Sequence, residues 1–235
     1  MAAAVYAAPA PVVLADTCAL LNVVRAPLRS AGAAAASGAL ALAGRLADPR
    51  TAWLVVADVV CDEWARDVGA AAAEVAHAVR EAERVTAGLA AAAAIVAPGP
   101  GVAPFRAGAL GLERRLHALT TRLIADARVF GADDDGCMQR AYRRAVVKHA
   151  PAARGKPEAA DCLIVEHYLE FARQLRGGGC DLPICFASSN TADYGRAAPG
   201  GASSAMRDPL PAQFAVLNLT FATDLAWAER LASPP

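Results

Sequence analysis

Four acidic residues of this sequence, Asp16, Glu63, Asp161 and Asp193, are spaced so that their carboxylates could meet at one site. Asp16 and Asp193 each follow a short apolar run, Glu63 comes shortly after another, and Asp161 lies early in a helical pattern. Four converging carboxylates repel one another unless a cation neutralises them or some stay protonated. Hard oxygen ligands favour Mg²⁺ or Mn²⁺ over zinc, and a site of this kind suits phosphodiester hydrolysis.

Each of these acids also has a purely structural alternative. Asp16 after an apolar run fits a helix N-cap, and Asp161 fits a first-turn acid that the helix dipole favours. Asp193 fits a turn closed with Asn190. These alternatives remain open for each residue taken alone, and the ligand hypothesis depends on all four acids occurring together.

The elements that must position these acids alternate between strands and helices. Short apolar runs predict buried strands, and Pro, Gly and Asp mark the breaks between them. The strands are expected at residues 11–15, 53–57, 183–187 and 214–219. The helices are expected at about 19–28, 38–46, 64–97, 110–130, 135–149, 157–176 and 223–231.

This alternation predicts an α/β fold in which a parallel sheet is flanked by helices. Asp58 fits the N-cap of a helix that would carry Glu63 in its first or second turn, and the adjoining Asp62 is the alternative acid there. Loops and helix N-termini converge beyond the carboxyl ends of parallel strands, which is where the acids are expected. The chain is interpreted as one domain, 1–235, with a helical insertion at about 70–150 that contains no strand.

A basic cluster precedes the helix of Asp161. Its members are Arg140, Arg143, Arg144, Lys148, Arg154 and Lys156. The first four recur at three- and four-residue spacing, so they can line one helix face. One interpretation is a solvated face, and the other is a track for an RNA backbone that leads to the acids.

Composition limits the remaining possibilities. Lys plus Arg and Asp plus Glu both number 23, so any affinity for nucleic acid must come from a local patch. None of the six cysteines forms a CxxC pair, and we expect them to be reduced. The first 15 residues carry no Lys or Arg, which disfavours a signal peptide, and no apolar stretch is long enough to cross a bilayer. A cytoplasmic protein without a membrane partner is therefore expected.

Four segments resemble, in this order, the acidic motifs of the PIN-domain nucleases. They are VVLADTCALLN, VCDEW, GKPEAADCLIVEHYLE and FASSNTADYG. The last is the most specific, because PIN proteins commonly show Ser or Thr, then Asn, then Asp and an aromatic residue there. The motifs cover roughly the first 65 and the last 80 residues.

The resemblance implies a Rossmann-like parallel sheet of four or five strands and a ribonuclease activity that depends on Mg²⁺ or Mn²⁺. By this match Asp16, Glu63, Asp161 and Asp193 would be the catalytic metal ligands. Polar supports would come from Thr17, Asn22 and Asn190. Glu166, on the same helix as Asp161, would either assist the site or face solvent.

Two other functions and several partners stay open. A phosphatase of the haloacid dehalogenase type also places an Asp after its first strand, but it needs a second Asp two residues on, where this chain has Cys18. A catalytically silent PIN-like module for RNA binding or assembly is the other alternative, and the presence of all four acids counts against it. RNA is the expected partner. An antitoxin-like protein or a second copy of the chain is also considered, although the chain is longer than the compact toxin nucleases.

Overall fold

The described residues of the computed structural model form a sheet of five parallel strands in the order β3-β2-β1-β4-β5. The strands are β1 (Val12–Ala15), β2 (Trp53–Ala57), β3 (Arg128–Phe130), β4 (Ile184–Ala187) and β5 (Leu219–Ala222). The structure describes residues 2–30, 32–47, 51–96, 106–131, 135–152 and 159–232, with only the backbone of Asp135. The expected α/β class with a Rossmann-like sheet is confirmed.

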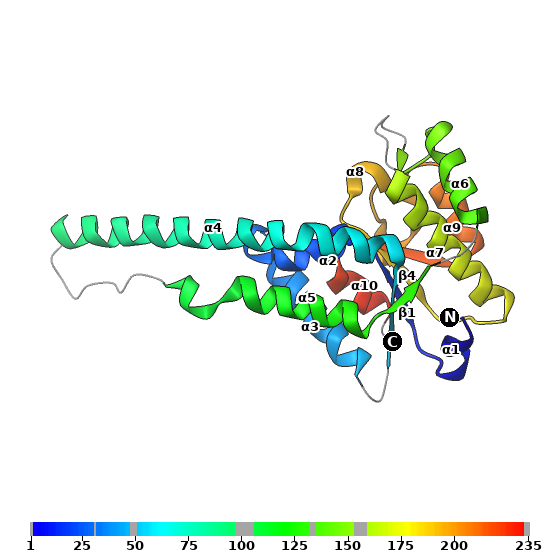
Figure 1. Ribbon diagram of the computed structural model, residues 1–235, viewed down its shortest axis with the longest axis horizontal. Coiled ribbons are helices and arrows are strands. Elements are labelled where there is room, and N and C mark those ends of the chain that lie inside the picture. The colour runs from blue at the N-terminus through cyan, green and yellow to red at the C-terminus, as the bar shows by residue number, and fades with distance from the viewer. Residues whose placement is uncertain are drawn as a thin grey trace.

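The central strands are apolar along their whole length because both faces of the sheet are covered. Every residue of β1, β2 and β4 is buried. The helices that follow β1 and β2 pack with the last helix on one face, while those that precede β4 and β5 cover the other (Figure 1). The first group contains α2 (Thr17–Val24), α3 (Gly32–Leu46), α5 (Leu112–Asp126) and α10 (Leu225–Leu231). The second contains α6 (Asp135–Val146), α7 (Ala159–Gly177) and α9 (Leu210–Val216).

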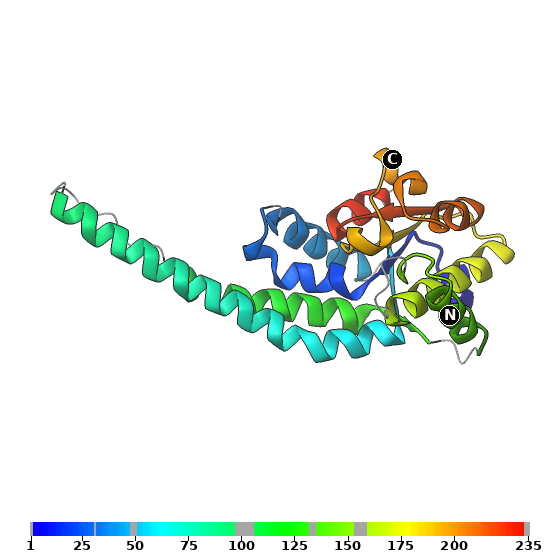
Figure 2. The same ribbon diagram turned by 90° about the horizontal axis from the view of Figure 1, so that it is seen from above.

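The longest helix, α4 (Asp58–Val96), runs far beyond the rest of the molecule (Figures 1 and 2). It begins where β2 ends, and α5 lies beside it over part of its length. The residues that α4 buries, from Val60 to Val79, all lie in its first 22 residues. The helical insertion predicted from the sequence is thus mainly an α4–α5 hairpin within the connection from β2 to β3.

Two expected elements are corrected by the structure. Residues 70–150 were expected to contain no strand, yet β3 pairs in parallel with β2, with Val56 opposite Val129. This edge strand has only three residues and exposes two of them, so it has no apolar run to detect. The strand expected at 214–219 begins instead at Leu219, because α9 continues to Val216 and Asn218 takes a left-handed conformation that ends it.

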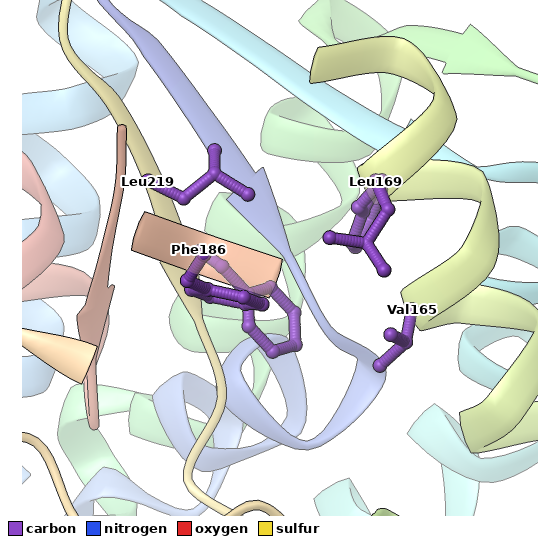
Figure 3. A pocket seen from close by; sticks show the side chains of 6 residues that line it. Val165, Leu169, Phe186 and Leu219 are labelled. Atoms are coloured by element: carbon purple, nitrogen blue, oxygen red, sulfur yellow. The ribbon is translucent and has the colours of Figure 1, made fainter. Parts of the chain in front are cut away.

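Phe186 of β4 lies at the centre of the packing between α7 and the sheet. Figure 3 shows Val165 and Leu169 of α7 turned toward Phe186 and toward Leu219 of β5. The gap between these side chains is too small to hold a water molecule. It is therefore part of the core and not a ligand site.

The remaining elements are short. They are the helices α1 (Ala2–Ala7) and α8 (Thr191–Tyr194), and the 3₁₀ turns η1 (Ala26–Leu28), η2 (Ala107–Leu110), η4 (Pro199–Gly201) and η5 (Ser203–Ala205). All six cysteines lie in described residues and none forms a disulfide, as expected. Within the same residues, no helix is both long enough and apolar enough to cross a bilayer.

Candidate active site

A polar pocket of about 330 Å³ opens at the carboxyl ends of β1 and β4. From β1 the chain adds β2 and β3 on one side of the sheet, and it then adds β4 and β5 on the other side of β1. The direction in which strands are added therefore reverses between β1 and β4. Ligands of open α/β sheets bind at such a switch point. The pocket is lined by Asp16, Thr17, Cys18, Leu21, Asn22, Arg25, Arg29, Glu63, Asp67, Asp161, Ser189 and Asn190.

Asp16 connects β1 to α2 but does not cap the helix with its side chain. Its Oδ2 instead accepts hydrogen bonds from Ser188 Oγ at 2.7 Å and Cys18 Sγ at 3.0 Å. Burial raises the pKa of the Asp16 carboxyl, the two hydrogen bonds oppose that rise, and the nearby charge of Glu63 adds to it. The carboxylate is therefore oriented but poorly solvated, and a cation in the pocket would stabilise its ionised form.

Glu63 reaches the pocket from the second turn of α4. Its Oε2 accepts a hydrogen bond of 2.6 Å from Thr17 Oγ1, which links the starts of α2 and α4. The neighbouring Asp62 is exposed and does not line the pocket. Of the two adjacent acids, Glu63 is therefore the one that the fold brings to Asp16.

Asp161 lines the same pocket from the first turn of α7. Tyr168, seven residues later and on the same helix face, fixes this helix against the sheet. Its hydroxyl donates to the carbonyl oxygen of Ala15 at 2.5 Å and accepts from the backbone N–H of Ala57 at 3.1 Å. The ends of β1 and β2 are thereby tied to the middle of α7, two helical turns after Asp161, which fixes the helix that carries Asp161.

Asp193 is placed differently from the other three acids. It is buried and does not line the pocket. Asn190 caps α8 by accepting a hydrogen bond from the backbone N–H of Asp193, and its Nδ2 donates to Asp193 Oδ2 at 3.0 Å. Asn190 itself lies on the pocket wall. The structural alternative, a turn closed by Asn190 and Asp193, is therefore the one that this structure shows. Asp193 contacts the pocket wall only indirectly, through its hydrogen bond with Asn190.

The described residues contain no group of three or more His, Cys, Asp or Glu side chains close enough to hold a metal ion. Three of the four expected acids share one pocket without being gathered around one point. The donor chemistry still fits a hard cation, since Mg²⁺ is commonly bound through one or two carboxylates and keeps several waters.

The pocket also holds charged residues that the sequence analysis missed. Asp67 lies one helical turn after Glu63, Arg25 is the C-cap of α2, and Arg29 follows η1. Arg25 pairs with Glu74 at 2.7 Å, and Arg29 Nη2 donates to Asn22 Oδ1 at 3.4 Å. Spacing of three or four residues from already chosen positions was the signal that could have found them.

Glu166 does not line this pocket, and it does not face solvent, so the expectation of a solvent-facing Glu166 is wrong. It is buried on another face of α7, with its Oε1 2.5 Å from Arg144 Nη2 and its Oε2 3.0 Å from Arg140 Nε. Arg144 is buried with it and is not part of an exposed basic face. Arg143 and Lys148 are exposed and Arg140 is half-buried, whereas residues 154 and 156 lie outside the described residues.

Comparisons of this chain with protein-family models, with curated proteins and with solved structures found no match.

Proposed function

We propose that this protein is a PIN-type nuclease that hydrolyses phosphodiester bonds of RNA with the help of Mg²⁺ or Mn²⁺. The observation that supports the proposal most is the pocket at the switch point of the sheet. There Asp16, Glu63 and Asp161 arrive from three different elements and line one cavity. A set of acids at the carboxyl edge of a parallel sheet is the arrangement that both the residue types and the PIN resemblance imply.

The charge of the pocket also supports a divalent cation. Four acids, Asp16, Glu63, Asp67 and Asp161, and two arginines line it, so carboxylates outnumber guanidinium groups on its wall. A wall rich in carboxylates favours a divalent cation such as Mg²⁺ or Mn²⁺. When bound, such an ion supplies charge neutralisation at the phosphate and activation of a water molecule.

Each neighbouring residue then has a definite task. Asp16, Glu63 and Asp161 would hold the cation, with its retained waters completing the coordination. Ser188 and Cys18 orient Asp16, and Thr17 orients Glu63, through the hydrogen bonds described above. Arg25 and Arg29 would attract the phosphate that is cleaved. Asp193 would position Asn190 on the pocket wall.

A cleavage assay tests this proposal with a matched pair of variants on α4. Fluorescent single-stranded RNA would be incubated with protein and Mg²⁺ or Mn²⁺, or with EDTA. Glu63→Gln should lower cleavage by at least about 100-fold, because it removes a ligand charge, whereas the exposed neighbour Asp62→Asn should leave cleavage nearly unchanged. Asp161→Asn should behave like Glu63→Gln.

Metal-independent cleavage, or equal activity in all four proteins, would exclude these residues as the catalytic acids. The second candidate is a catalytically silent module that binds RNA, and the lack of a preassembled group of three ligands among the described side chains favours it. RNA binding by the wild type without any cleavage in Mn²⁺ would establish that alternative.

A further inference from the structure

A second pocket, of about 310 Å³, opens between α6, α7 and α9. It shares no lining residue with the candidate active-site pocket lined by Asp16, Glu63 and Asp161, which we call the acidic pocket. Its charged and polar lining comes from the end of α6, from the middle of α7 and from α9. The charged and polar lining residues are Arg140, Arg143, Arg144, His149, Glu166 and Gln213. We call it the basic pocket.

A buried hydrogen-bond network forms one wall of the basic pocket. Glu166 Oε1 accepts from both Nε and Nη2 of Arg144, at 3.0 and 2.5 Å. The same guanidinium donates to the carbonyl oxygen of Ala150 at 2.7 Å and to Gln213 Oε1 at 2.9 Å. Glu166 Oε2 accepts from Arg140 Nε at 3.0 Å. One carboxylate thus holds two guanidinium groups in fixed positions.

The basic pocket carries an excess of positive charge. Three arginines and one glutamate line it, so guanidinium groups outnumber carboxylates on its wall. Arg140 also contacts Glu170, but Glu170 is itself paired with Arg173 at 2.6 Å. Arg143 is exposed, and no described carboxylate lies within ion-pair distance of it. Arg143 is therefore available for an anion that enters the pocket.

We propose that the basic pocket binds a phosphate group of the RNA backbone. Guanidinium groups match the geometry of phosphate oxygens and favour two parallel hydrogen bonds. The carbonyl groups at the end of α6 oppose an anion, but their effect equals roughly half a charge, which is less than the excess carried by the arginines. Arg143 would contact the phosphate, and Glu166 would act as a positioning residue for Arg140 and Arg144.

The position of the basic pocket suits the hydrolysis proposed above, on which the choice of RNA rests. Asp161 and Glu166 are five residues apart on α7, which corresponds to roughly 7.5 Å along the helix axis. The two residues also point to different faces of α7, because five residues turn about 140° around the helix axis. A strand that places one phosphate in the basic pocket and another beside the acids would therefore have to pass around the start of α7. The basic pocket would hold the substrate in register without reading its bases.

The test measures binding without catalysis, using fluorescence anisotropy of an eight-nucleotide RNA in EDTA. Arg143→Gln should weaken binding by about tenfold, because a charge-assisted hydrogen bond is lost. The slope of log affinity against log salt should fall by about 0.7. Lys148→Gln is the matched control, since Lys148 is an exposed cation near the same helix end that does not line the pocket. It should change binding by less than about twofold.

Glu166→Gln separates a built site from diffuse attraction. It removes one negative charge, so diffuse attraction would strengthen RNA binding. Loss of the fixed positions of Arg140 and Arg144 should instead weaken it. The melting temperature would show whether the variant folds, and Arg143→Gln decides the question if it does not. Inorganic phosphate should compete with the RNA. Binding of inorganic phosphate by a protein that shows no RNA affinity would overturn the RNA assignment and mean that the pocket takes free phosphate instead.

Equal effects of Arg143→Gln and Lys148→Gln, or no effect of either, would overturn the assignment. Because the acidic pocket is without metal in EDTA, this result is independent of the cleavage assay. If the wild type cleaves RNA and Arg143→Gln binds RNA as tightly as the wild type, only the assignment of the basic pocket is overturned. If Arg143→Gln binds RNA more weakly but the wild type does not cleave it, only the proposed nuclease activity is overturned.

Discussion

At the scale of single residues, the candidate site depends on the buried carboxylate of Asp16, which accepts hydrogen bonds from a hydroxyl and a thiol. Burial raises the pKa of the Cys18 thiol, and the nearby charge of Asp16 raises it further. The thiol therefore stays protonated at neutral pH and serves as a hydrogen-bond donor to Asp16, not as a nucleophile. Ser188 donates to the same carboxylate oxygen. Asp16 is thus oriented in the fold at a cost in solvation.

Asp16→Asn should therefore stabilise the metal-free protein at neutral pH. The amide keeps the shape of the side chain and removes a charge whose burial is unfavourable. Each gain of ~1 kcal/mol raises the melting temperature of a chain of this size by about 2–4 °C. Differential scanning fluorimetry in EDTA would measure the shift, and the same variant should lose the rise in melting temperature that we expect Mn²⁺ to give the wild type.

The stability difference between wild type and Asp16→Asn should also depend on pH. The pKa of Asp16 in the metal-free folded state lies above its unfolded value of 3.8. Its ionisation therefore costs stability at pH values above the folded pKa, and this cost disappears as the pH falls through that pKa toward 3.8. The advantage of the variant should shrink on acidification, and an advantage that grew instead would contradict the sign of this pKa shift.

At the scale of elements, the packing of α3 on α10 requires a glycine. A Cβ on Gly38 would lie 2.2 Å from the Cα of Ala226, so the two helices can approach only because this side chain is missing. A Cβ on Gly44, in the same helix, would have nothing within 4 Å. Substituting each glycine by alanine therefore distinguishes the effect of helix propensity, at Gly44, from the effect of packing, at Gly38, within the same helix.

Gly38→Ala and Gly44→Ala should change stability in opposite directions. Alanine at Gly44, where there is open space, should add up to about 1 kcal/mol to the free energy of unfolding, because it favours helix. Alanine at Gly38 should cost about 1–3 kcal/mol, since the helices must move apart or strain. Urea denaturation would measure both, and a stable Gly38→Ala protein would show that α10 can shift without loss.

At the scale of the whole molecule, the core ends partway along α4. Val75 is fully buried, whereas Val85 is 46% exposed and Leu89 is 65% exposed. The end of the helix extends away from the sheet and α5 (Figure 2). Helical stability in proteins comes mostly from packing, so the two parts of α4 should contribute unequally.

The same substitution at two positions of α4 tests this difference. Val75→Ala should lower the free energy of unfolding by about 1–3 kcal/mol, because it leaves a cavity in a packed cluster. Val85→Ala should change it by less than about 0.5 kcal/mol. Urea denaturation of both variants would decide it, and equal losses would mean that the outer part of the helix is packed in solution.

The sequence by itself determined the alternation of elements and the edge at which the acids lie. Apolar runs at β1, β2 and β4 are recognisable because both faces of a parallel sheet are buried. Asp16, Glu63 and Asp161 were predictable as neighbours because residues that follow such strands, and the start of the helix that leads into β4, lie at the same edge of the sheet. These features depend on local pattern and on general rules of topology.

Only the tertiary structure decided the short elements and the partners of the charged groups. β3 exists because β2 offers it a pairing edge, a contact between distant segments that leaves no periodicity in three residues. Arg144 is buried because Glu166 and Gln213 receive its hydrogen bonds. The chain has no net charge, yet folding separates an acidic pocket from a basic one. Charge balance is a property of composition, whereas the potential that a ligand meets depends on which side chains are brought together in space.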